Sequence, residues 1–293
     1  MINYSLIIPH RNTPELLQRC LDSIPHRQDL EIIIADDNSS ISVVDFDNFP
    51  GNGRSDVKII LNKEGRGAGY CRNIAIDKAI GKWLLFSDSD DYFSDYLPIL
   101  LDKYASDDDT DMVFLNAKAI DEFGKLSNLS INKYIDNFLK HKRKALDVLR
   151  FSFWSPWSRM VKRSVFIDNK ISFEEVPVGN DTMGILSASR FSKSFAVESN
   201  VVYYYYKPTQ GSQTKAAYSD KTYYQRLEQK LKVNQFYKEV DYPYYWPIAR
   251  AFRDKHLNKT DTYRQIILKW EYKKAADFLA TINYFIAKIL KII

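Results

Sequence analysis

Three carboxylates crowd into four residues directly after an apolar run. The run covers residues 83–86, and Asp88, Asp90 and Asp91 follow it. Such a run is typical of a buried strand, and open α/β sheets bind ligands beyond the carboxyl ends of their strands. Because like charges this close repel each other, a divalent cation between them would stabilise the group. The segment predicts a metal that holds an anion such as phosphate, and a solvated turn is the alternative.

Charged residues also stand where two earlier apolar runs end. Arg11 follows the run at residues 4–8, and Asp37 follows the run at 31–35. A guanidinium forms paired hydrogen bonds with phosphate oxygens, and a carboxylate accepts hydrogen bonds from a nucleobase or from ribose hydroxyls. These side chains therefore predict a cleft for a nucleotide. The alternatives are a surface turn at Arg11 and a carboxylate turn at Asp36 and Asp37.

A glycine-rich segment opens a helix predicted over residues 67–80, which Gly81 is expected to end. The segment, residues 65–69, does not match the dinucleotide fingerprint, because it lacks the third glycine. A helix start of this kind still suits a nucleotide phosphate. Arg72 and Asn73, in the first turns, could reach a base or a phosphate, and a solvated helix face is the alternative.

Two features of the second half could serve an acceptor molecule. Asp181 precedes a helical pattern, where it is either a helix-start residue or a catalytic carboxylate. Trp157 and the tyrosines at 203–206 could stack on a sugar ring, and core packing is the alternative. Trp157 is the preferred acceptor residue among these aromatic side chains.

The elements that must position these residues alternate between strand and helix patterns. Strand patterns lie at residues 4–8, 31–35, 57–61, 82–87 and 112–115, and helical patterns separate most of them. This alternation predicts an α/β fold with a mainly parallel central sheet flanked by helices. Helical patterns dominate from about residue 220, which predicts a helical C-terminal extension.

Length and composition exclude several classes of protein. The chain has 293 residues, of which 45% are hydrophobic and 27% charged, as in a soluble globular protein with a sizeable core. Cys20 and Cys71 match no metal or redox spacing, and the four histidines are scattered, so a zinc site is not expected. No signal peptide, membrane span or nucleic-acid motif is recognised, which predicts a cytoplasmic protein without a nucleic-acid partner.

The C-terminal residues form a basic amphipathic pattern. Apolar residues recur at helical spacing over 278–293, and lysines interleave with them, at Lys273, Lys274, Lys288 and Lys291. Such a helix can lie on an anionic membrane, here the inner face of the cell membrane. Docking on the domain itself, or on a second copy in a homodimer, is the alternative.

Four segments in this order resemble the family 2 glycosyltransferases, which have the GT-A (Rossmann-like) fold. They are residues 6–12, 34–39, 69–83 and 86–91. The resemblance covers roughly residues 3–212 and is of the bacterial surface-polysaccharide type, such as capsule synthesis. It implies a glycosyltransferase domain over 1–212, with a nucleotide-sugar half at 1–115 and an acceptor half at 116–212, before a helical extension at 213–293.

The resemblance also implies a role for each matching residue. Asp88-Ser89-Asp90 match the D-x-D motif, in which Asp90 holds Mn²⁺ or Mg²⁺ and Asp88 lies near the ribose or the metal. Asp181 matches the aspartate that acts as general base. The other implied contacts are with the donor, at Pro9, Arg11, Asp37, Arg72 and Ser89, with Asp37 on the uracil ring, and with the acceptor, at Trp157 and Asn180, which replaces the usual glutamate.

Together these features predict an inverting glycosyltransferase. It would move a sugar from a nucleotide-sugar donor, expected to be UDP-linked, to a hydroxyl of a saccharide or lipid-linked saccharide. A sugar nucleotidyltransferase is one alternative, but residues 9–15 lack the glycine-rich loop that it should carry after the first strand. A non-catalytic nucleotide-sugar binding protein is the other, and intact Asp88, Asp90 and Asp181 argue against it.

Overall fold

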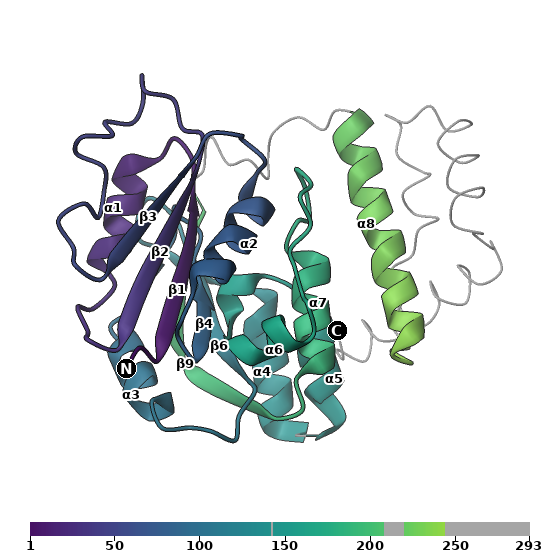
Figure 1. The fold of residues 1–293 in the computed structure, drawn as a ribbon. Helices are drawn as coiled ribbons and strands as arrows, with labels where there is room; N and C mark the ends of the chain where they lie inside the picture. Colours follow the sequence, from purple (N-terminus) through teal and green to yellow (C-terminus); the bar gives the residue numbers. More distant parts are fainter. Residues whose placement is uncertain (142, 208–219, 244–293) are drawn as a thin grey trace.

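The apolar runs of the first half form the centre of a mixed sheet. The computed structural model describes residues 1–141, 143–207 and 220–243 (Figure 1). Within these ranges, nine strands form one sheet in the order β3-β2-β1-β4-β8-β6-β9-β5, with β7 paired to β6. The strands are β1 (Tyr4–His10), β2 (Leu30–Asp37), β3 (Val57–Asn62), β4 (Trp83–Phe86), β5 (Tyr92–Phe93), β6 (Met112–Ile120), β7 (Leu126–Asn128), β8 (Arg159–Lys162) and β9 (Phe195–Tyr206).

Four strands confirm the predicted parallel arrangement, and β8 interrupts it. Strands β3, β2, β1 and β4 run parallel, and every residue of β1 and β2 is buried. Strands buried on both faces are continuously apolar, which is why the sequence shows unbroken runs there. Strand β8 is antiparallel to both β4 and β6, whereas β6 and β9 are again parallel. The sheet is therefore mainly parallel with antiparallel members.

Helices flank this sheet and connect its strands. Helix α2 packs on β1 and β2, and α8 runs beside α7 (Figure 1). The helices are α1 (Pro14–Asp22), α2 (Ala68–Lys78), α3 (Leu97–Tyr104), α4 (Ser130–His141), α5 (Arg143–Phe151), α6 (Arg163–Asp168), α7 (Thr182–Phe191) and α8 (Asp220–Glu239), with a short 3₁₀ turn at Pro156–Ser158.

Helix α8 confirms the helical pattern predicted from about residue 220, over the residues of that segment that the structure describes. Its apolar side chains Val233 and Phe236 pack in one cluster with Phe151 of α5 and Leu186 of α7. The predicted boundary at 212/213 and the basic amphipathic pattern at 273–293 lie outside the described residues. Among the residues that the structure does describe, no helix is long and apolar enough to cross a membrane.

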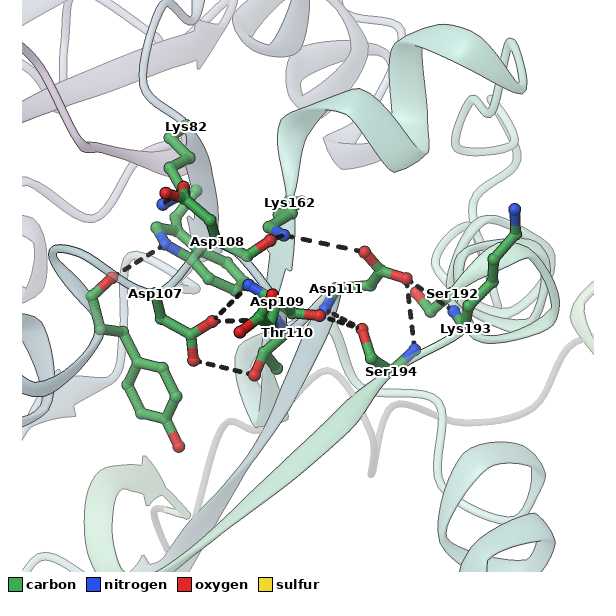
Figure 2. Close-up of polar contacts among 12 residues, drawn as sticks. Lys82, Asp107, Asp108, Asp109, Thr110, Asp111, Lys162, Ser192, Lys193 and Ser194 are labelled. Atoms are coloured by element: carbon green, nitrogen blue, oxygen red, sulfur yellow. Dashed lines mark hydrogen bonds and ion pairs between the residues drawn. The ribbon is translucent and has the colours of Figure 1, made fainter.

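A second acidic run, Asp107–Asp111, forms the turn before β6 (Figure 2). Asp107 Oδ1 accepts hydrogen bonds from the backbone N–H groups of Asp109 and Thr110, at 2.9 and 2.8 Å. Asp111 Oδ2 accepts one from the N–H of Lys193, at 2.7 Å. Carboxylates that satisfy nearby backbone amides in this way shape turns. This run therefore joins β6 to the segment before β9, and its role is structural.

The helix predicted over 67–80 ends earlier than expected, at Lys78. Ala79 is extended, with φ −68° and ψ 135°, so Gly81 does not end the helix. Instead the N–H of Gly81 donates to Ser5 Oγ at 2.8 Å. A Cβ on Gly81 would lie 2.6 Å from the backbone nitrogen of Ser5. Glycine is required here because the chain passes directly over β1.

Replacing Gly81 with alanine is expected to lower the free energy of unfolding by about 1–3 kcal/mol, because the new methyl group overlaps the β1 backbone. Urea unfolding of the variant and the wild type measures the difference. Gly53→Ala is the matched control, since nothing lies within 4 Å of a Cβ added at Gly53. Equal midpoints for the two variants would contradict the close approach.

Candidate functional site

The carboxyl ends of β1, β2 and β4 bring the predicted donor residues to one edge of the sheet. His10, the last residue of β1, pairs in register with Asp36 of β2. The N–H of Ser87, just after β4, donates to the carbonyl of Ile7 in β1 at 3.0 Å, so the acidic segment starts beside β1. Ligands of open α/β sheets bind at such an edge.

Asp36 stabilises a turn at the end of β2, as the alternative to nucleotide binding predicted. His10 Nε2 accepts a hydrogen bond from the N–H of Thr13, which leaves the proton on Nδ1 to be donated to Asp36 Oδ2 at 2.8 Å. The N–H of Ser39 donates to Asp36 Oδ1 at 2.9 Å. Burial raises the pKa of Asp36, but these hydrogen bonds outweigh burial and the pKa lies below its usual value. Asp36 therefore fixes the strand-end loops.

Asp37 connects the end of β2 to the start of α2. Both of its carboxylate oxygens lie 3.0 Å from the backbone nitrogen of Gly67, the residue before α2. An anion at a helix N-terminus is stabilised by the helix dipole. Arg11 Nη1 lies 3.6 Å from Asp37 Oδ2, and the Arg11 side chain is 57% exposed. Arg11 thus lies at this edge with its guanidinium accessible to a ligand.

Arg72 of α2 joins the donor residues to the acceptor segment. Its guanidinium is buried and donates from Nη2 to Asp88 Oδ1 at 2.7 Å, and from Nη1 to Asn180 Oδ1 at 2.8 Å. The second bond spans 108 positions of the chain. Predicted residues from both halves of the sequence are therefore brought together around one side chain.

Asp181 lies next to this bridge and precedes α7. Its side chain makes no cap hydrogen bond to the backbone of the helix, and a hydrogen bond from the Thr182 side chain acts to lower its pKa. Burial raises the pKa of Asp181; Arg72 lowers it and Asp88 raises it further, and the net shift is upward. A carboxylate with a raised pKa is a stronger base, which suits proton abstraction near neutral pH.

Helix α2 also holds the segment that leads to Asp181. Asn73 Nδ2 donates to the carbonyl of Phe173 at 2.9 Å, and Asn73 Oδ1 accepts from the Phe173 N–H at 2.8 Å. A Cβ on Gly69 would lie 2.0 Å from the carbonyl oxygen of Glu174, so glycine permits the close approach. The expectation that Asn73 reaches a base or phosphate was wrong, because both polar atoms of its side chain bind this backbone.

A hydrogen-bonded pair of Asp91 and Tyr203, which the sequence did not predict, fixes the acidic turn. Asp91 is fully buried, and its Oδ2 accepts a hydrogen bond from Tyr203 Oη at 2.7 Å. Its Oδ1 accepts from the N–H of Tyr206 at 2.7 Å, and the N–H of Asp88 donates to Tyr203 Oη at 3.0 Å. Burial raises the pKa of Asp91 well above its usual value. Because residues 203–206 are all tyrosine, no pattern in the sequence distinguishes Tyr203 from its neighbours.

The environment of the Asp90 carboxylate disfavours its negative charge. Burial, together with the charge of Asp88, raises the pKa of Asp90 to about 6. Arg19 Nη2 donates to the backbone carbonyl of Asp90 at 2.6 Å, while Ser89 Oγ lies 3.2 Å from Thr13 Oγ1. Within the described ranges, the Asp90 carboxylate forms no ion pair. Its charge is therefore disfavoured unless a cation joins it.

The acidic turn fits a cation that arrives with a substrate. In the part of the chain described by the structure, no group of three or more His, Cys, Asp or Glu side chains forms a protein-built metal cage. Mg²⁺ is commonly bound by one or two carboxylates together with substrate phosphates. Asp90 and Asp88 provide that kind of donor set.

Trp157 and Pro9 lie in the interior. Trp157 is only 5% exposed, and its ring stacks on the ring of Tyr203, with the two centroids 5.1 Å apart. It also stacks on Tyr205, at 5.8 Å. Pro9 is buried in β1 opposite Ala35 of β2. These contacts support packing roles, and the acceptor role of Trp157 stays a prediction.

Tyr203→Phe is expected to lower the free energy of unfolding by about 1–3 kcal/mol, because the buried Asp91 oxygen loses its donor. Thermal and urea unfolding measure the loss. Tyr204→Phe is the matched control, because Tyr204 lies on the opposite face of β9 and pairs its ring with Tyr92. If both variants lost equal stability, the hydroxyl of Tyr203 would not be the cause.

Comparison with known proteins gives a consistent family. The model of glycosyl transferase family 2 matches residues 5–169. A poly(ribitol-phosphate) beta-glucosyltransferase of Bacillus spizizenii is 27% identical over 224 residues, covering 73% of this chain and 34% of that enzyme. The putative glycosyltransferase EpsH of Bacillus subtilis is 29% identical over 209 residues, covering 69% of this chain and 60% of its own. The match therefore spans about a third of the length of the Bacillus spizizenii enzyme and about three-fifths of the length of EpsH.

Solved structures share the fold. Staphylococcus aureus TarS, residues 1–349 in complex with UDP-GlcNAc, matches with a TM-score of 0.63 and 19% identity, over 96% of this chain and 79% of that one. The mannosyltransferase PcManGT of Pyrobaculum calidifontis, in complex with GDP-Man and Mn²⁺, matches with a TM-score of 0.54 and 17% identity, over 99% of this chain and 86% of that one. These likenesses establish the α/β arrangement.

Proposed function

The chain belongs to glycosyl transferase family 2, and on that premise we propose that it transfers a sugar from a nucleotide-sugar donor to an acceptor hydroxyl. The Arg72 bridge carries this proposal. It joins Asp88, at the strand end expected to face the donor, to Asn180, the neighbour of Asp181. A displacement between two bound substrates requires both sites to be held at a fixed separation, and one buried guanidinium that binds Asp88 and Asn180 supports such an arrangement.

The donor is proposed to be UDP-linked. Arg11 and Asp37 lie close together at the ends of β1 and β2. There a guanidinium can bind phosphate oxygens, and a carboxylate can accept hydrogen bonds from a nucleobase. The TarS structure contains UDP-GlcNAc, which supports a uridine nucleotide. The PcManGT structure contains GDP-Man, so a guanosine nucleotide is the competing donor.

The reaction is proposed to be a single displacement that inverts the anomeric carbon. Asp181 accepts the proton of the acceptor hydroxyl, whose oxygen forms a bond to the anomeric carbon. The bond from that carbon to the diphosphate oxygen breaks, and its electron pair leaves with the nucleoside diphosphate. Arg72 keeps the Asn180 end of the acceptor segment in place during attack.

Mn²⁺ or Mg²⁺ is proposed to accompany the donor, held by Asp90 and Asp88. When bound, the ion would offset the charge that develops on the leaving diphosphate. The raised pKa of Asp90 supports this assignment, because a cation relieves the cost of ionising a buried carboxyl beside Asp88. The Mn²⁺ in PcManGT is consistent with it.

The acceptor is proposed to be a hydroxyl of a saccharide or polyol surface polymer, free or lipid-linked. The Bacillus spizizenii relative is named for a poly(ribitol-phosphate) acceptor, which is rich in hydroxyls. Asn180 is the predicted acceptor residue nearest to the Arg72 bridge. Peripheral membrane contact, or a homodimer through the C-terminal residues, remains a prediction from the sequence pattern at 273–293.

Asp181→Asn and Asp90→Asn should separate the two proposed roles. Asp181→Asn is expected to reduce transfer by about 10²–10⁴-fold while UDP binding persists, because only the base is lost. Asp90→Asn should instead abolish the Mn²⁺-dependent part of UDP binding. Calorimetric titration of UDP with and without Mn²⁺, together with a radiolabelled-sugar transfer assay, measures both. A wild-type rate of transfer by Asp181→Asn would exclude Asp181 as the base. If the wild-type protein bound neither UDP nor GDP, the result would favour a protein that retains the fold without the activity.

Metal-assisted UDP binding should weaken as the pH falls through about 6. Asp90 must be ionised to hold the cation, and its pKa in the free protein is raised to about 6. Between about pH 7.5 and about pH 5 the ionised fraction, and with it the apparent affinity, should fall about tenfold. Calorimetry across this range measures the change. Asp90→Asn should show a flat profile, and an equal slope in that variant would assign the titration to another group.

A further inference from the structure

Helix α8 contacts the segment that carries Asp181. Lys232 Nζ of α8 lies 2.5 Å from Glu174 Oε1, and these side chains are 29% and 24% exposed. The N–H of Glu174 donates in turn to the carbonyl of Asn180 at 3.0 Å. The ion pair is therefore one backbone hydrogen bond away from the residue that precedes Asp181.

A second contact from α8 closes on the same turn. Gln229 is 8% exposed, and its Cγ lies 3.1 Å from the position of a Cβ on Gly179. Gly179 has φ +73°, which permits the tight turn into Asn180 and Asp181. Gln229 and Lys232 are three positions apart, so both lie on one side of α8. This side of the helix contacts both Glu174 and Gly179.

These contacts extend a continuous polar network across the site. Asn180 receives a hydrogen bond from Arg72, and Arg72 also binds Asp88. Lys232 at one end is thus connected to the donor-side carboxylate at the other through Glu174, Asn180 and Arg72. The apolar side of α8 anchors the helix, since Val233 is fully buried and Tyr237 Oη donates to the carbonyl of Phe151 at 2.6 Å.

We propose that Lys232 and Glu174 are positioning residues that hold the Asn180–Asp181 turn against Arg72. This inference rests on the proposed function, in which Asp181 removes a proton from the acceptor. A partly exposed ion pair contributes little to global stability, so its effect should appear in the placement of Asp181. A displacement of about 1 Å at a reacting group can reduce a rate by about 10²-fold. Helix α8 thereby helps to position the proposed base.

Lys232→Met in the full chain is the first test, with Lys238→Met as the matched control. Lys238 lies exposed on the same helix. Lys232→Met should lower kcat for transfer at least tenfold, within the range that a misplaced group costs, with UDP affinity in the presence of Mn²⁺ unchanged. Lys232→Arg should restore most of the rate because it keeps the charge, and Lys238→Met should match the wild type.

A double-mutant cycle with Glu174→Gln distinguishes positioning from general loss of structure. If the two residues act as a pair, the double variant should be no slower than either single variant. Circular dichroism and melting temperature confirm that each variant is folded, and the isosteric Glu174→Gln tests the pair if Lys232→Met fails to fold. Unchanged kcat in Lys232→Met, or multiplying losses in the double variant, would overturn the pair. A wild type that binds no nucleotide would instead overturn the proposed function.

Discussion

The buried guanidinium of Arg72 is the constraint on which the rest of the site depends. A buried charge is costly unless it is paired and hydrogen-bonded, so Arg72 requires acceptors brought to it by the fold. One is Asp88, just after β4 in the predicted nucleotide-sugar half, and the other is Asn180, from the predicted acceptor half. Satisfying this side chain therefore obliges both halves of the chain to close on α2. Gly69 and Asn73 of the same helix make that closure sterically possible and fix its register.

The carboxylates at the strand ends are of one residue type, and their different surroundings give them different roles. Asp36 is saturated by His10 and Ser39, and Asp37 caps α2, so both are structural as well as close to the cleft. Asp91 is buried on the hydroxyl of Tyr203. The pKa of Asp90 is raised to about 6, and in the described residues its carboxylate forms no ion pair. Four aspartates on one sheet edge thus receive different tasks from different neighbours.

The contrast with the second acidic run supports this distinction. Asp107–Asp111 is as rich in carboxylates as the segment after β4, yet backbone amides bind Asp107 and Asp111 (Figure 2). Lys82 pairs with Asp108 in the same run. It also lies before β6, away from the carboxyl ends of β1, β2 and β4. Position at the strand ends and the absence of an ion pair at Asp90 within the described part of the chain, rather than acidic composition, distinguish the segment after β4 as the candidate site. The same reasoning brings α8 into the site, because its Lys232 meets Glu174 beside Asp181.

The sequence by itself determined the parallel half of the sheet, the order of the motifs and the residues at the strand ends. Apolar runs and helix signals are local, so β1, β2 and α2 could be predicted from neighbouring residues, although the end of α2 could not. The tertiary structure decided which polar groups meet. Asn73 turned to the backbone of Phe173, Tyr203 became the partner of Asp91, and Trp157 stacked in the interior. The two hydrogen-bonded pairs join residues 100 and 112 positions apart, and no local pattern encodes which distant atoms will satisfy a buried polar group.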